Sequence, residues 1–541
     1  MSYTSHVDTF ARDNLPPRDQ WPELIFEIPE VQYPDRINCA VELLDKHVAN
    51  GWGDHPVIYN NDGTMTYAQM LERVNRVAHV LTEDMGLVAG NRVLLRGANS
   101  AMMAVLWYAV AKAGMIVVAT MAMLREKELV DVIDKGQINA AISDKTLDTE
   151  LLAAQKRCPS LKQIVYFNDT SAEGLEARMA TKSADFKAVD TAADDTVLIA
   201  FTSGTTGKPK GTMHFHRDVL AICDCFPKSI VHMTSDDICI GTPPLAFTFG
   251  LGGILLFPMR VGGATVLLEK LSPEIMLKAI QEFKITHTWS SPVFYRQMSA
   301  LAKNYDLSSL QKCISAGEAL PVSTRTMWRE ASGIEMIDGI GATEMLHIFI
   351  SAEEKDVRPG ATGTPIPGYQ ACILDGEGHQ LPRGNIGRLA VKGPTGCRYL
   401  ADDRQANYVK NGWNVTGDAY LLDEDGYFWF HARTDDIILT AGYNVAGPEV
   451  EEALMKHEAV AECAVVGAPD KERGQIIKAF VVLKAGHTRD DAMIKALQDY
   501  VKQIIAPYKY PRAIEFLDAL PRTNTGKLQR FALRQTGMRM P

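Results

Sequence analysis

A run rich in glycine and hydroxyl side chains constrains this chain more than any other feature. Residues 201–211 read FTSGTTGKPKG; an apolar run at 197–201 leads into them, and a mixed segment begins at Thr212. Glycine lets the backbone pass close to a ligand. Backbone N–H groups, hydroxyls and ammonium groups at such a turn can face polyphosphate oxygens. The run therefore predicts a phosphate-binding loop.

The nucleotide-binding P-loop, GxxxxGK[ST], does not fit this run. Lys208 follows Gly207, but the residue five positions before Gly207 is Thr202 rather than glycine. Pro209 stands where Ser or Thr must hold magnesium and where a helix must begin, and it has no N–H to donate. The run is a phosphate loop of another kind.

Size and composition favour a soluble enzyme with more than one domain. The 541 residues are too many for one hydrophobic core, and 46% hydrophobic with 23% charged residues is ordinary for a globular protein. A formal net charge of −10 argues against nucleic-acid binding. No apolar run could span a membrane and the N-terminus lacks a signal-peptide core, so we expect a cytoplasmic location. The nine cysteines form no CxxC pair and are expected to be buried thiols.

Strand patterns alternate with helical patterns over most of the chain. Apolar spacing predicts a helix over 67–81, a strand over 92–95 and a helix over 101–113. This alternation is typical of parallel sheets covered by helices. Further strands are expected at 139–143, 163–167, 265–268, 286–289 and 313–316.

Two changes of pattern follow. From about Cys372, short segments with Gly and Asp turns predict a small β-rich region. After Arg433, helices expected at 449–456 and 490–503 flank strands expected at 461–467 and 478–483, which makes a compact α+β unit. We expect a large α/β N-terminal domain with a β-rich subdomain, residues 1–434, and a small α+β C-terminal domain, residues 435–541.

Further polar motifs lie along the chain: SAGE at 315–318, DGIGATE at 338–344, TGD at 416–418 with Arg433 after it, and PRTNTGK at 521–527. Together with the glycine-rich loop, and in this order, they resemble the motifs of the acyl-adenylate-forming enzymes, which include acyl-CoA ligases, adenylation domains of peptide synthetases and luciferases. The resemblance covers the whole chain. It is strongest to the aromatic-acid CoA ligases of the benzoate and 2-aminobenzoate type, in PPLAFTFGLGG (243–253), GIGATEMLHIF (339–349) and AGYNVAGPEVE (441–451).

This resemblance implies an AMP-forming acid–thiol ligase that uses ATP, Mg²⁺ and coenzyme A. A carboxylate is a poor acylating agent until its attack on the α-phosphate of ATP gives an acyl-adenylate, from which a thiol displaces AMP. Because negative charge develops on the phosphoryl oxygens, catalysis is mostly positioning and cation supply. The expected acid is 2-aminobenzoate or benzoate, with 2-aminobenzoate favoured.

Three residues are implied as catalytic. Lys527 would bridge the carboxylate and the α-phosphate, Thr343 would contact the α-phosphate, and Glu344 would hold Mg²⁺. The other implied ATP- and AMP-binding residues are Thr202, Ser203, Gly204, Thr205, Thr206, Gly207, Lys208 and Lys210 for the β- and γ-phosphates, Gly317, Glu318, Asp338, Gly339 and Ile340 for adenine, and Asp418 and Arg433 for ribose.

For the thiol step, the resemblance implies that the C-terminal domain rotates about a hinge at Asp435 and withdraws Lys527. The residues of the loop that then enters are Gly442, Tyr443 and Asn444. The chain departs from the family pattern at Ala432, where glycine usually precedes the arginine, and at 446–448, where AGP replaces a single small residue before proline. The second departure leaves the CoA contacts open.

The acid pocket is implied by the same resemblance. Glycine at 341 leaves room for a ring where ligases for the smallest acids carry tryptophan. Phe247 and Phe249, two positions apart on an expected strand, offer flat apolar walls. His347 is a specificity candidate, and a histidine packed in the core is the alternative. The full set is Phe247, Thr248, Phe249, Ala316, Gly341, Met345 and His347.

Alternatives to an aromatic acid–CoA ligase stay open. They are a stand-alone adenylation enzyme that loads a carrier protein, a medium-chain acyl-CoA ligase, and a luciferase-like oxygenase or non-catalytic homologue. Only 14 residues follow Lys527, so no attached carrier domain is expected. His214 and His216 are expected to pack beneath the phosphate loop. A homodimer is left open.

Overall fold

The structure, a computed structural model, describes residues 3–203, 209–433, 436–440, 443–470, 474–522 and 528–537. The chain divides into two compact units. Unit 1 comprises Met1–Ala371 and Val391–Val415, and unit 2 comprises Cys372–Ala390 and Thr416–Pro541. The predicted domain boundary at residues 434 and 435 lies outside the described residues and stays a prediction.

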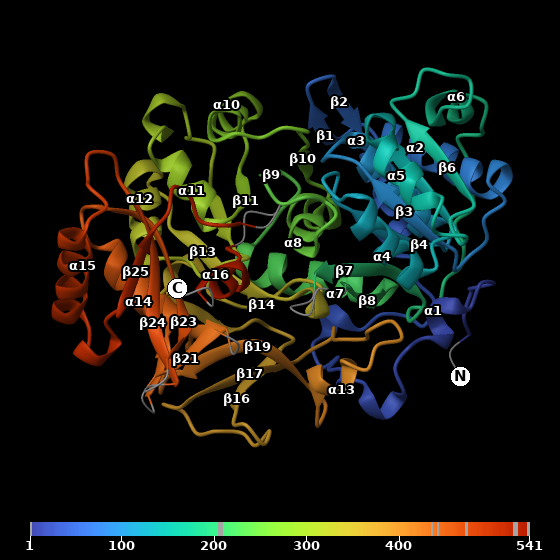
Figure 1. Ribbon diagram of the computed structural model, residues 1–541. Coiled ribbons are helices and arrows are strands. Elements are labelled where there is room, and N and C mark those ends of the chain that lie inside the picture. Colours follow the sequence, from blue (N-terminus) through green and yellow to red (C-terminus); the bar gives the residue numbers. More distant parts are fainter. Residues whose placement is uncertain are drawn as a thin grey trace. The chain divides into compact units, whose positions relative to one another are not determined.

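The first sheet of unit 1 is the parallel sheet that the alternating pattern predicts (Figure 1). Its strands follow the order β6, β5, β3, β4, β7, β8, and every neighbouring pair is parallel except β7 with β8. β3 is buried along its whole length, as expected when helices cover both faces of a sheet. The strands are β3 (Arg92–Arg96), β4 (Ile116–Thr120), β5 (Ala140–Asp144), β6 (Gln163–Phe167), β7 (Thr196–Ser203) and β8 (Pro209–Phe215).

The helices of this sheet begin where local chemistry allows them. At the start of α2 (Tyr67–His79), the Gln69 N–H donates to Thr66 Oγ1 and the Thr66 N–H donates to the Gln69 side chain, which is a capping box. Ser100 caps α3 (Ala101–Lys112) in the same way through Met103 N–H. The other helices are α1 (Phe10–Asp13), α4 (Glu126–Gly136), α5 (Asp148–Gln155), α6 (Leu175–Ala180) and α7 (His216–Phe226).

A second sheet of unit 1 places the ends of several strands side by side. Its order is β15, β14, β13, β12, β11, β9, β10, β1, β2, and the strands from β13 to β1 are parallel. Ser315, the last residue of β12, lies opposite Asp338 inside β13, so the SAGE and DGIGATE motifs are neighbours there. The strands are β1 (Pro56–Asn60), β2 (Gly63–Thr66), β9 (Ile238–Gly241), β10 (Ala264–Val266), β11 (His287–Ser290), β12 (Lys312–Ser315), β13 (Met336–Gly341), β14 (Ile348–Ser351) and β15 (Ala361–Pro365).

An apolar core lies between this sheet and its helices. Trp328, Tyr295 and Met298 have no exposed surface and pack in one cluster with β11–β13 neighbours such as Cys313. The helices are α8 (Thr248–Leu251), α9 (Phe257–Val261), α10 (Pro273–Phe283), α11 (Pro292–Ser299) and α12 (Val322–Ser332). The short elements α13 (Gln405–Tyr408) and β18 (Val409–Lys410) complete unit 1.

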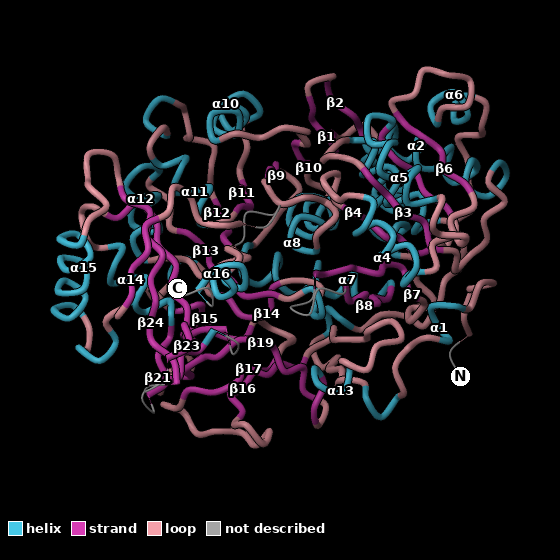
Figure 2. Tube along the Cα trace, in the orientation of Figure 1, coloured by secondary structure: helices cyan, strands magenta, loops and turns pink. Residues whose placement is uncertain are grey.

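Unit 2 combines strands and helices as the sequence predicts (Figure 2). One group of strands follows the order β16, β17, β19, β20, a second is the hairpin β21–β22, and a third is the sheet β23, β24, β25. The apolar side chains of α14, α15 and the third sheet form one core, which includes Val450 and Leu497. The elements are β16 (Gln370–Leu374), β17 (Ile386–Lys392), β19 (Trp413–Leu422), β20 (Phe428–Arg433), β21 (Ile437–Thr440), β22 (Tyr443–Ala446), α14 (Gly447–Met455), β23 (Val460–Asp470), β24 (Gly474–Leu483), α15 (Asp491–Ile504), β25 (Ala513–Phe516) and α16 (Arg530–Gly537).

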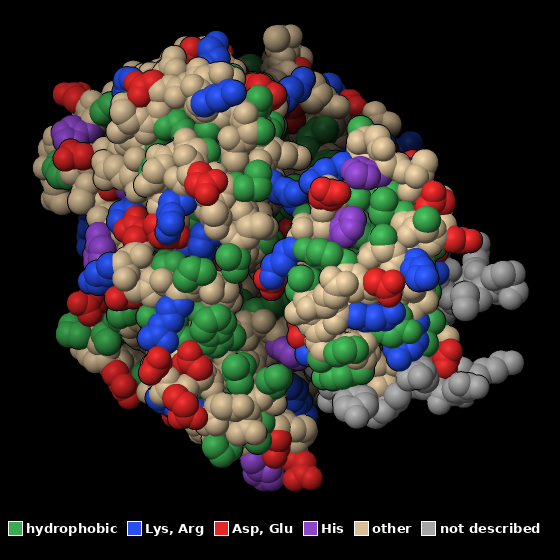
Figure 3. Space-filling view, turned by 90° about the vertical axis from the view of Figure 1, so that its left-hand side faces the viewer, with side chains coloured by type: hydrophobic (Ala, Val, Ile, Leu, Met, Phe, Trp, Pro, Cys, Tyr) green, Lys and Arg blue, Asp and Glu red, His purple; other side chains and the backbone are tan. Residues whose placement is uncertain are grey.

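The thiols agree with the expectation from composition, and the surface carries charges of both signs. Acidic and basic side chains are interspersed on the face in Figure 3. In the part of the chain that the structure describes, no helix has both the length and the apolar composition needed to cross a bilayer. The described cysteines form no disulfide, and all are buried except the half-buried Cys463.

Candidate active site

The predicted phosphate loop joins two antiparallel strands. Thr202 pairs with Lys210 and Ser203 pairs with Pro209 in the β7–β8 hairpin. Because β8 begins at Pro209, a strand and not a helix follows the loop, as the failed P-loop match predicts. Five of the predicted phosphate ligands, Gly204, Thr205, Thr206, Gly207 and Lys208, lie outside the described residues, and so does the Ser203 side chain.

Lys210 and Glu344, predicted from separate motifs, meet in unit 1 through a third residue. The Tyr399 hydroxyl donates a short hydrogen bond to Glu344 Oε1 and accepts one of 2.8 Å from Lys210 Nζ. Lys210 Nζ lies 3.5 Å from Glu344 Oε1. Burial and the Glu344 carboxylate raise the pKa of the Tyr399 phenol, which therefore stays protonated. A cation and a carboxylate at one point are what Mg²⁺ and phosphate binding require.

Buried residues under β8 hold the turn that carries Thr343 and Glu344. His214 Nε2–H donates to the Thr343 carbonyl over 2.8 Å, and its Nδ1 lies 3.8 Å from Asp218 Oδ2. Burial alone would raise the pKa of Asp218, but the charge of Arg398, together with His214 and the charge of Arg217, outweighs burial and lowers that pKa. His214 and His216 are both buried, as predicted. The His214 side chain thus supports the backbone of this turn.

The predicted adenine residues lie at the carboxyl ends of β12 and β13. Ala316, Gly317 and Glu318 follow β12, and Gly317 has a φ of +91°, a value that glycine adopts without strain. Asp338 to Ile340 lie on β13 beside them. Carboxyl ends of neighbouring parallel strands are the usual ligand position in open α/β sheets. The fold therefore brings these motifs together.

Asp338 is the titratable group at this sheet edge whose pKa changes most. Its Oδ1 is shielded from solvent and meets no hydrogen-bond donor among the described residues. Burial raises its pKa to about 7, against the opposing charge of Arg325. The carboxyl is thus close to half-protonated at neutral pH.

Replacing Asp338 with asparagine should stabilise the protein more at about pH 8 than at about pH 5. A carboxyl whose folded pKa is raised from 3.8 to about 7 contributes stability that is fully present below the unfolded pKa. That stability is lost progressively from about pH 3.8 until the pH has risen through about 7, because the carboxyl ionises freely in the unfolded chain while the folded protein keeps it protonated or must bury its charge. The thermal midpoint of the variant should exceed that of the wild type by roughly 2–4 °C at the higher pH. Scanning calorimetry at both pH values measures this, and an equal difference at both would contradict a raised pKa.

The predicted acid pocket is built differently from expectation around Phe247. Phe247 and Phe249 are not on a strand: Phe247 precedes α8, and Phe249 lies inside that helix. The apolar run 249–257 continues as helical turns, and glycines at 250, 252 and 253 let these turns lie close to Pro244, His347 and Trp289. Phe247, Thr248 and Phe249 remain half-buried, so the prediction of a strand is wrong and their exposure is compatible with a pocket.

His347 lies inside a cluster of aromatic rings. Its ring centroid is 4.5 Å from that of Phe257, 5.7 Å from Phe249 and 6.0 Å from Trp289. Phe226 completes the cluster at 5.8 Å. We call these five residues the aromatic cluster. It combines flat apolar walls with one polar ring.

His347 is neutral and keeps one nitrogen as an acceptor. Burial lowers its pKa to about 3, so the imidazole carries no charge at neutral pH. Nε2 lies 3.4 Å from the Phe249 carbonyl, which can only accept, and this places the ring hydrogen on Nε2. Nδ1 is then an acceptor, and no described residue donates to it. The interpretation as a residue packed in the core is confirmed by the burial of His347, and its role in specificity stays a prediction.

Gly341 is needed by the backbone as well as by a pocket. A Cβ at position 341 would lie 2.8 Å from the carbonyl carbon and oxygen of His347. Any other residue would push the His347 backbone away. Ala316 and Met345 are buried, with 5% and 0% exposure.

In unit 2, Asp418 and Arg433 form the pair that the ribose prediction requires. They lie opposite each other on β19 and β20, with Oδ1 and Nη1 3.1 Å apart. Gly417 makes room for the guanidinium, since a Cβ there would lie 2.5 Å from Arg433 Nη2. A carboxylate held by an arginine can accept hydrogen bonds from vicinal hydroxyls.

The residues predicted for the thiol step are only partly described. Asp435, Gly442 and Lys527 lie outside the described residues, and the side chains of Tyr443 and Asn444 do as well. The backbone of β21 and β22 forms a hairpin in which Thr440 pairs with Tyr443. The predicted thiol-step roles of these residues stay predictions.

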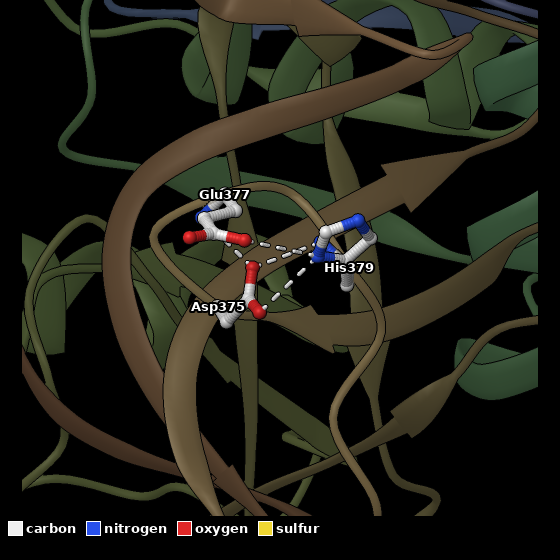
Figure 4. A group of neighbouring side chains, drawn as sticks. All are labelled: Asp375, Glu377 and His379. Carbon is white, nitrogen blue, oxygen red and sulfur yellow. Dashed lines mark hydrogen bonds and ion pairs between the residues drawn. The ribbon is translucent and has the colours of Figure 1, made fainter.

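Asp375, Glu377 and His379 gather on a turn of unit 2 that the sequence analysis did not single out (Figure 4). His379 Nδ1 lies 3.5 Å from Asp375 Oδ2 and 3.7 Å from Glu377 Oε2. Asp375 Oδ1 accepts from the N–H groups of residues 377, 378 and 379, and these bonds lower its pKa. The carboxylate serves to close the turn, and it is not assigned to the active site.

Sequence reasoning missed Tyr399 and three rings of the aromatic cluster. Tyr399 stands 189 positions after Lys210 and 55 after Glu344, and no motif links the three. Phe226, Phe257 and Trp289 occur in ordinary apolar segments. Only the packing of the sheets makes them neighbours.

Known proteins are similar to this chain over almost its whole length. The family model described as "AMP-binding enzyme" matches residues 45–399, and "AMP-binding enzyme C-terminal domain" matches residues 449–527. Benzoate–CoA ligase of Thauera aromatica is 34% identical over 94% of this chain and 97% of its own length. The mouse mitochondrial acyl-coenzyme A synthetase ACSM3 is 30% identical over 94% of this chain and 91% of its own length.

Solved structures agree with these sequence matches. The anthranilate CoA ligase AuaEII, in complex with anthranoyl-AMP, superposes with a TM-score of 0.88 at 32% identity over 94% of this chain and 99% of its own. A benzoate CoA ligase from Burkholderia xenovorans gives 0.84 at 30% identity over 92% and 100%.

Proposed function

Because the chain belongs to the AMP-binding enzyme family and is an AMP-forming acyl-CoA ligase of that family, we propose that its acid substrate is aromatic, with 2-aminobenzoate preferred to benzoate. Two kinds of support favour this proposal: the aromatic cluster beside the predicted pocket, and the substrates in the names of the similar ligases.

The observation that carries the proposal is the state of His347. A flat ring of the substrate packs well against Phe249, Phe247 and their neighbours. A buried acceptor without a donor is costly, so His347 Nδ1 favours a ligand that brings an N–H or O–H group. The 2-amino group of 2-aminobenzoate supplies an N–H donor, whereas benzoate supplies none.

The adenylation step is proposed to use the charges gathered around Glu344. Lys210 offers a cation to the polyphosphate, and the Thr343 hydroxyl offers a donor to the α-phosphate. Glu344 fits a Mg²⁺ ligand because it is a buried carboxylate. It lies 3.5 Å from the lysine that would meet the polyphosphate, so a metal there would also be near the phosphates. Mg²⁺, when bound, would neutralise charge on the departing pyrophosphate. Lys527 is proposed to bring a second cation between the carboxylate and the α-phosphate.

The remaining site residues are proposed to bind the nucleotide and to serve the thiol step. Asp418, paired with Arg433, would accept hydrogen bonds from the ribose hydroxyls. Gly317, Glu318 and Asp338 would line the adenine. Asp435 would act as the hinge, and the 442–444 segment would meet the pantetheine.

A substrate panel tests the proposal. Formation of AMP and of the CoA thioester should be measured with 2-aminobenzoate, 2-methylbenzoate, benzoate and octanoate, each read as kcat/KM. The expected order places 2-aminobenzoate first, 2-methylbenzoate below benzoate, and octanoate last. Preference for octanoate would overturn the aromatic-acid proposal. A thioester on a holo carrier protein, without one on CoA, would favour the carrier-loading alternative.

Replacing His347 with phenylalanine should change the selectivity between 2-aminobenzoate and benzoate more than the activity with benzoate. The ring keeps its place in the aromatic cluster, but the Nδ1 acceptor is lost. We expect kcat/KM for 2-aminobenzoate to fall about tenfold, which corresponds to one buried hydrogen bond. For benzoate the change should be within about threefold.

The matched control is His379→Phe, which removes an exposed imidazole in unit 2. It should leave both values unchanged. Equal losses for the two acids in the His347 variant would indicate that the imidazole only packs, and would contradict its role in selecting the 2-amino group.

A further inference from the structure

Tyr399 joins the two charged residues on which the proposed ATP site depends. It has no exposed surface, and its hydroxyl both donates to Glu344 Oε1 and accepts from Lys210 Nζ, the latter over 2.8 Å. The Lys210 ammonium also lies 4.8 Å from the centroid of the Tyr399 ring. One side chain thus contacts a charged group from the strand after the phosphate loop and one from the DGIGATE motif.

The backbone around Tyr399 fixes where its phenol points. Residues 398–400 run antiparallel to residues 211–213 of β8: Met213 N–H donates to the Arg398 carbonyl and Leu400 N–H to the Gly211 carbonyl, both over 2.8 Å. The Tyr399 N–H donates to the buried Gln405 side chain over 2.9 Å. These bonds hold the Tyr399 backbone against β8, the strand that carries Lys210.

Two adjacent residues of this segment reach the same turn by different routes. Tyr399 contacts Glu344 directly, while Arg398 pairs with Asp218 beneath His214, which donates to the Thr343 carbonyl. The segment thus supports both Thr343 and Glu344.

We propose that Tyr399 is a positioning residue for adenylation, whose phenol keeps Lys210 and Glu344 apart and oriented so that the ammonium can turn to the ATP polyphosphate. The inference rests on the proposed ATP roles of those two residues. Lys210 Nζ is nearer to the phenol oxygen than to the carboxylate, 2.8 against 3.5 Å. Without the phenol oxygen, the carboxylate becomes the nearest acceptor of this ammonium.

The physical reason is that a partly buried ion pair strengthens as it shortens. Attraction between opposite charges grows with decreasing distance and decreasing dielectric constant. A Lys210–Glu344 pair shorter than the present contact of 3.5 Å would compete with the phosphates for the ammonium and with the metal for the carboxylate. The phenol instead gives each charged group a hydrogen bond of its own. A ligand replaces either hydrogen bond more easily than it separates a close ion pair.

The test is Tyr399→Phe, which removes the hydroxyl and keeps the ring. Binding of ATP and of AMP should be measured by titration calorimetry in EDTA without acid, where neither metal nor chemistry contributes. The affinity for ATP should fall about tenfold, the effect expected for losing one charge-assisted hydrogen bond. The affinity for AMP, which lacks the β- and γ-phosphates, should stay within about twofold and also shows that the variant is folded.

A second readout separates the half-reactions. In Tyr399→Phe, pyrophosphate exchange should slow, while thioester formation from supplied acyl-adenylate should stay within about twofold of the wild type. In a Lys210→Met background, Tyr399→Phe should cause no further loss of ATP affinity, because the two residues act through one contact.

The matched control is Tyr33→Phe, which removes another phenol–carboxylate hydrogen bond, that of Tyr33 with Asp224 at 2.7 Å. It should leave the affinities for both nucleotides unchanged. Equal weakening of ATP and AMP in Tyr399→Phe, or no weakening of either, would overturn the inference. A wild-type chain that bound neither nucleotide would instead overturn the proposed ATP site, and the inference with it.

Discussion

Replacing Lys527 with alanine is expected to lower the rate of adenylation by roughly 10²–10³-fold, the loss typical of removing one preorganised charge donor. The proposed reason is that the substrate carboxylate and the α-phosphate are both anions, and the Lys527 ammonium would lie between them. Thioester formation from supplied acyl-adenylate should largely survive, because the proposed rotation withdraws this lysine before the thiol attacks. Pyrophosphate exchange and CoA release measure the two steps separately.

Lys502→Ala is the matched control for this variant. Lys502 belongs to α15 of the same unit and pairs with Asp499 over 2.9 Å at the surface. Its removal should leave both half-reactions at the wild-type rate. If Lys527→Ala slowed adenylation and thioester formation equally, the proposed alternation between two orientations of the C-terminal domain would be refuted.

Glu344→Gln is expected to reduce adenylation by roughly 10²-fold or more at saturating ATP and to raise the Mg²⁺ concentration needed for half-maximal rate. The amide preserves the size of the side chain and still accepts the hydrogen bond from Tyr399. It removes the negative charge that the proposed metal site requires. Pyrophosphate exchange as a function of MgCl₂ concentration measures both effects.

Glu353→Gln serves as the control here, because Glu353 pairs with Lys355 over 3.1 Å outside the site. In this variant, the dependence of pyrophosphate exchange on MgCl₂ concentration should match that of the wild type. An unchanged half-saturating concentration in Glu344→Gln would mean that the carboxylate does not hold the metal and that its pairing with Lys210 is structural.

Local sequence patterns predicted much of the fold. The helix expected at 67–81 and the strand expected at 92–95 correspond to α2 and β3, because apolar spacing reports which face of an element is buried. The β-rich region and the α+β unit that were predicted after residue 372 correspond to the strands and helices of unit 2. These elements could be predicted because neighbours in the sequence largely decide them.

The wrong prediction around Phe247 has a physical cause. Alternation of Phe247 and Phe249 indicates a strand, yet the glycines that follow allow a helix to pack against His347 and Trp289. Trp289 lies on β11, about 40 residues further along the chain. Tertiary packing at such a distance overrides a two-residue pattern.

The sequence by itself determined which chemical groups this protein has for its reaction and in what order they occur, since motif residues such as Lys210, Glu344 and Asp418 are identified by their immediate neighbours. Only the tertiary structure decided what those groups touch. The phenol between Lys210 and Glu344, the neutral imidazole among aromatic rings and the raised pKa of Asp338 all depend on side chains from distant strands. Burial and hydrogen bonding are properties of the packed sheets, and no short stretch of sequence contains them.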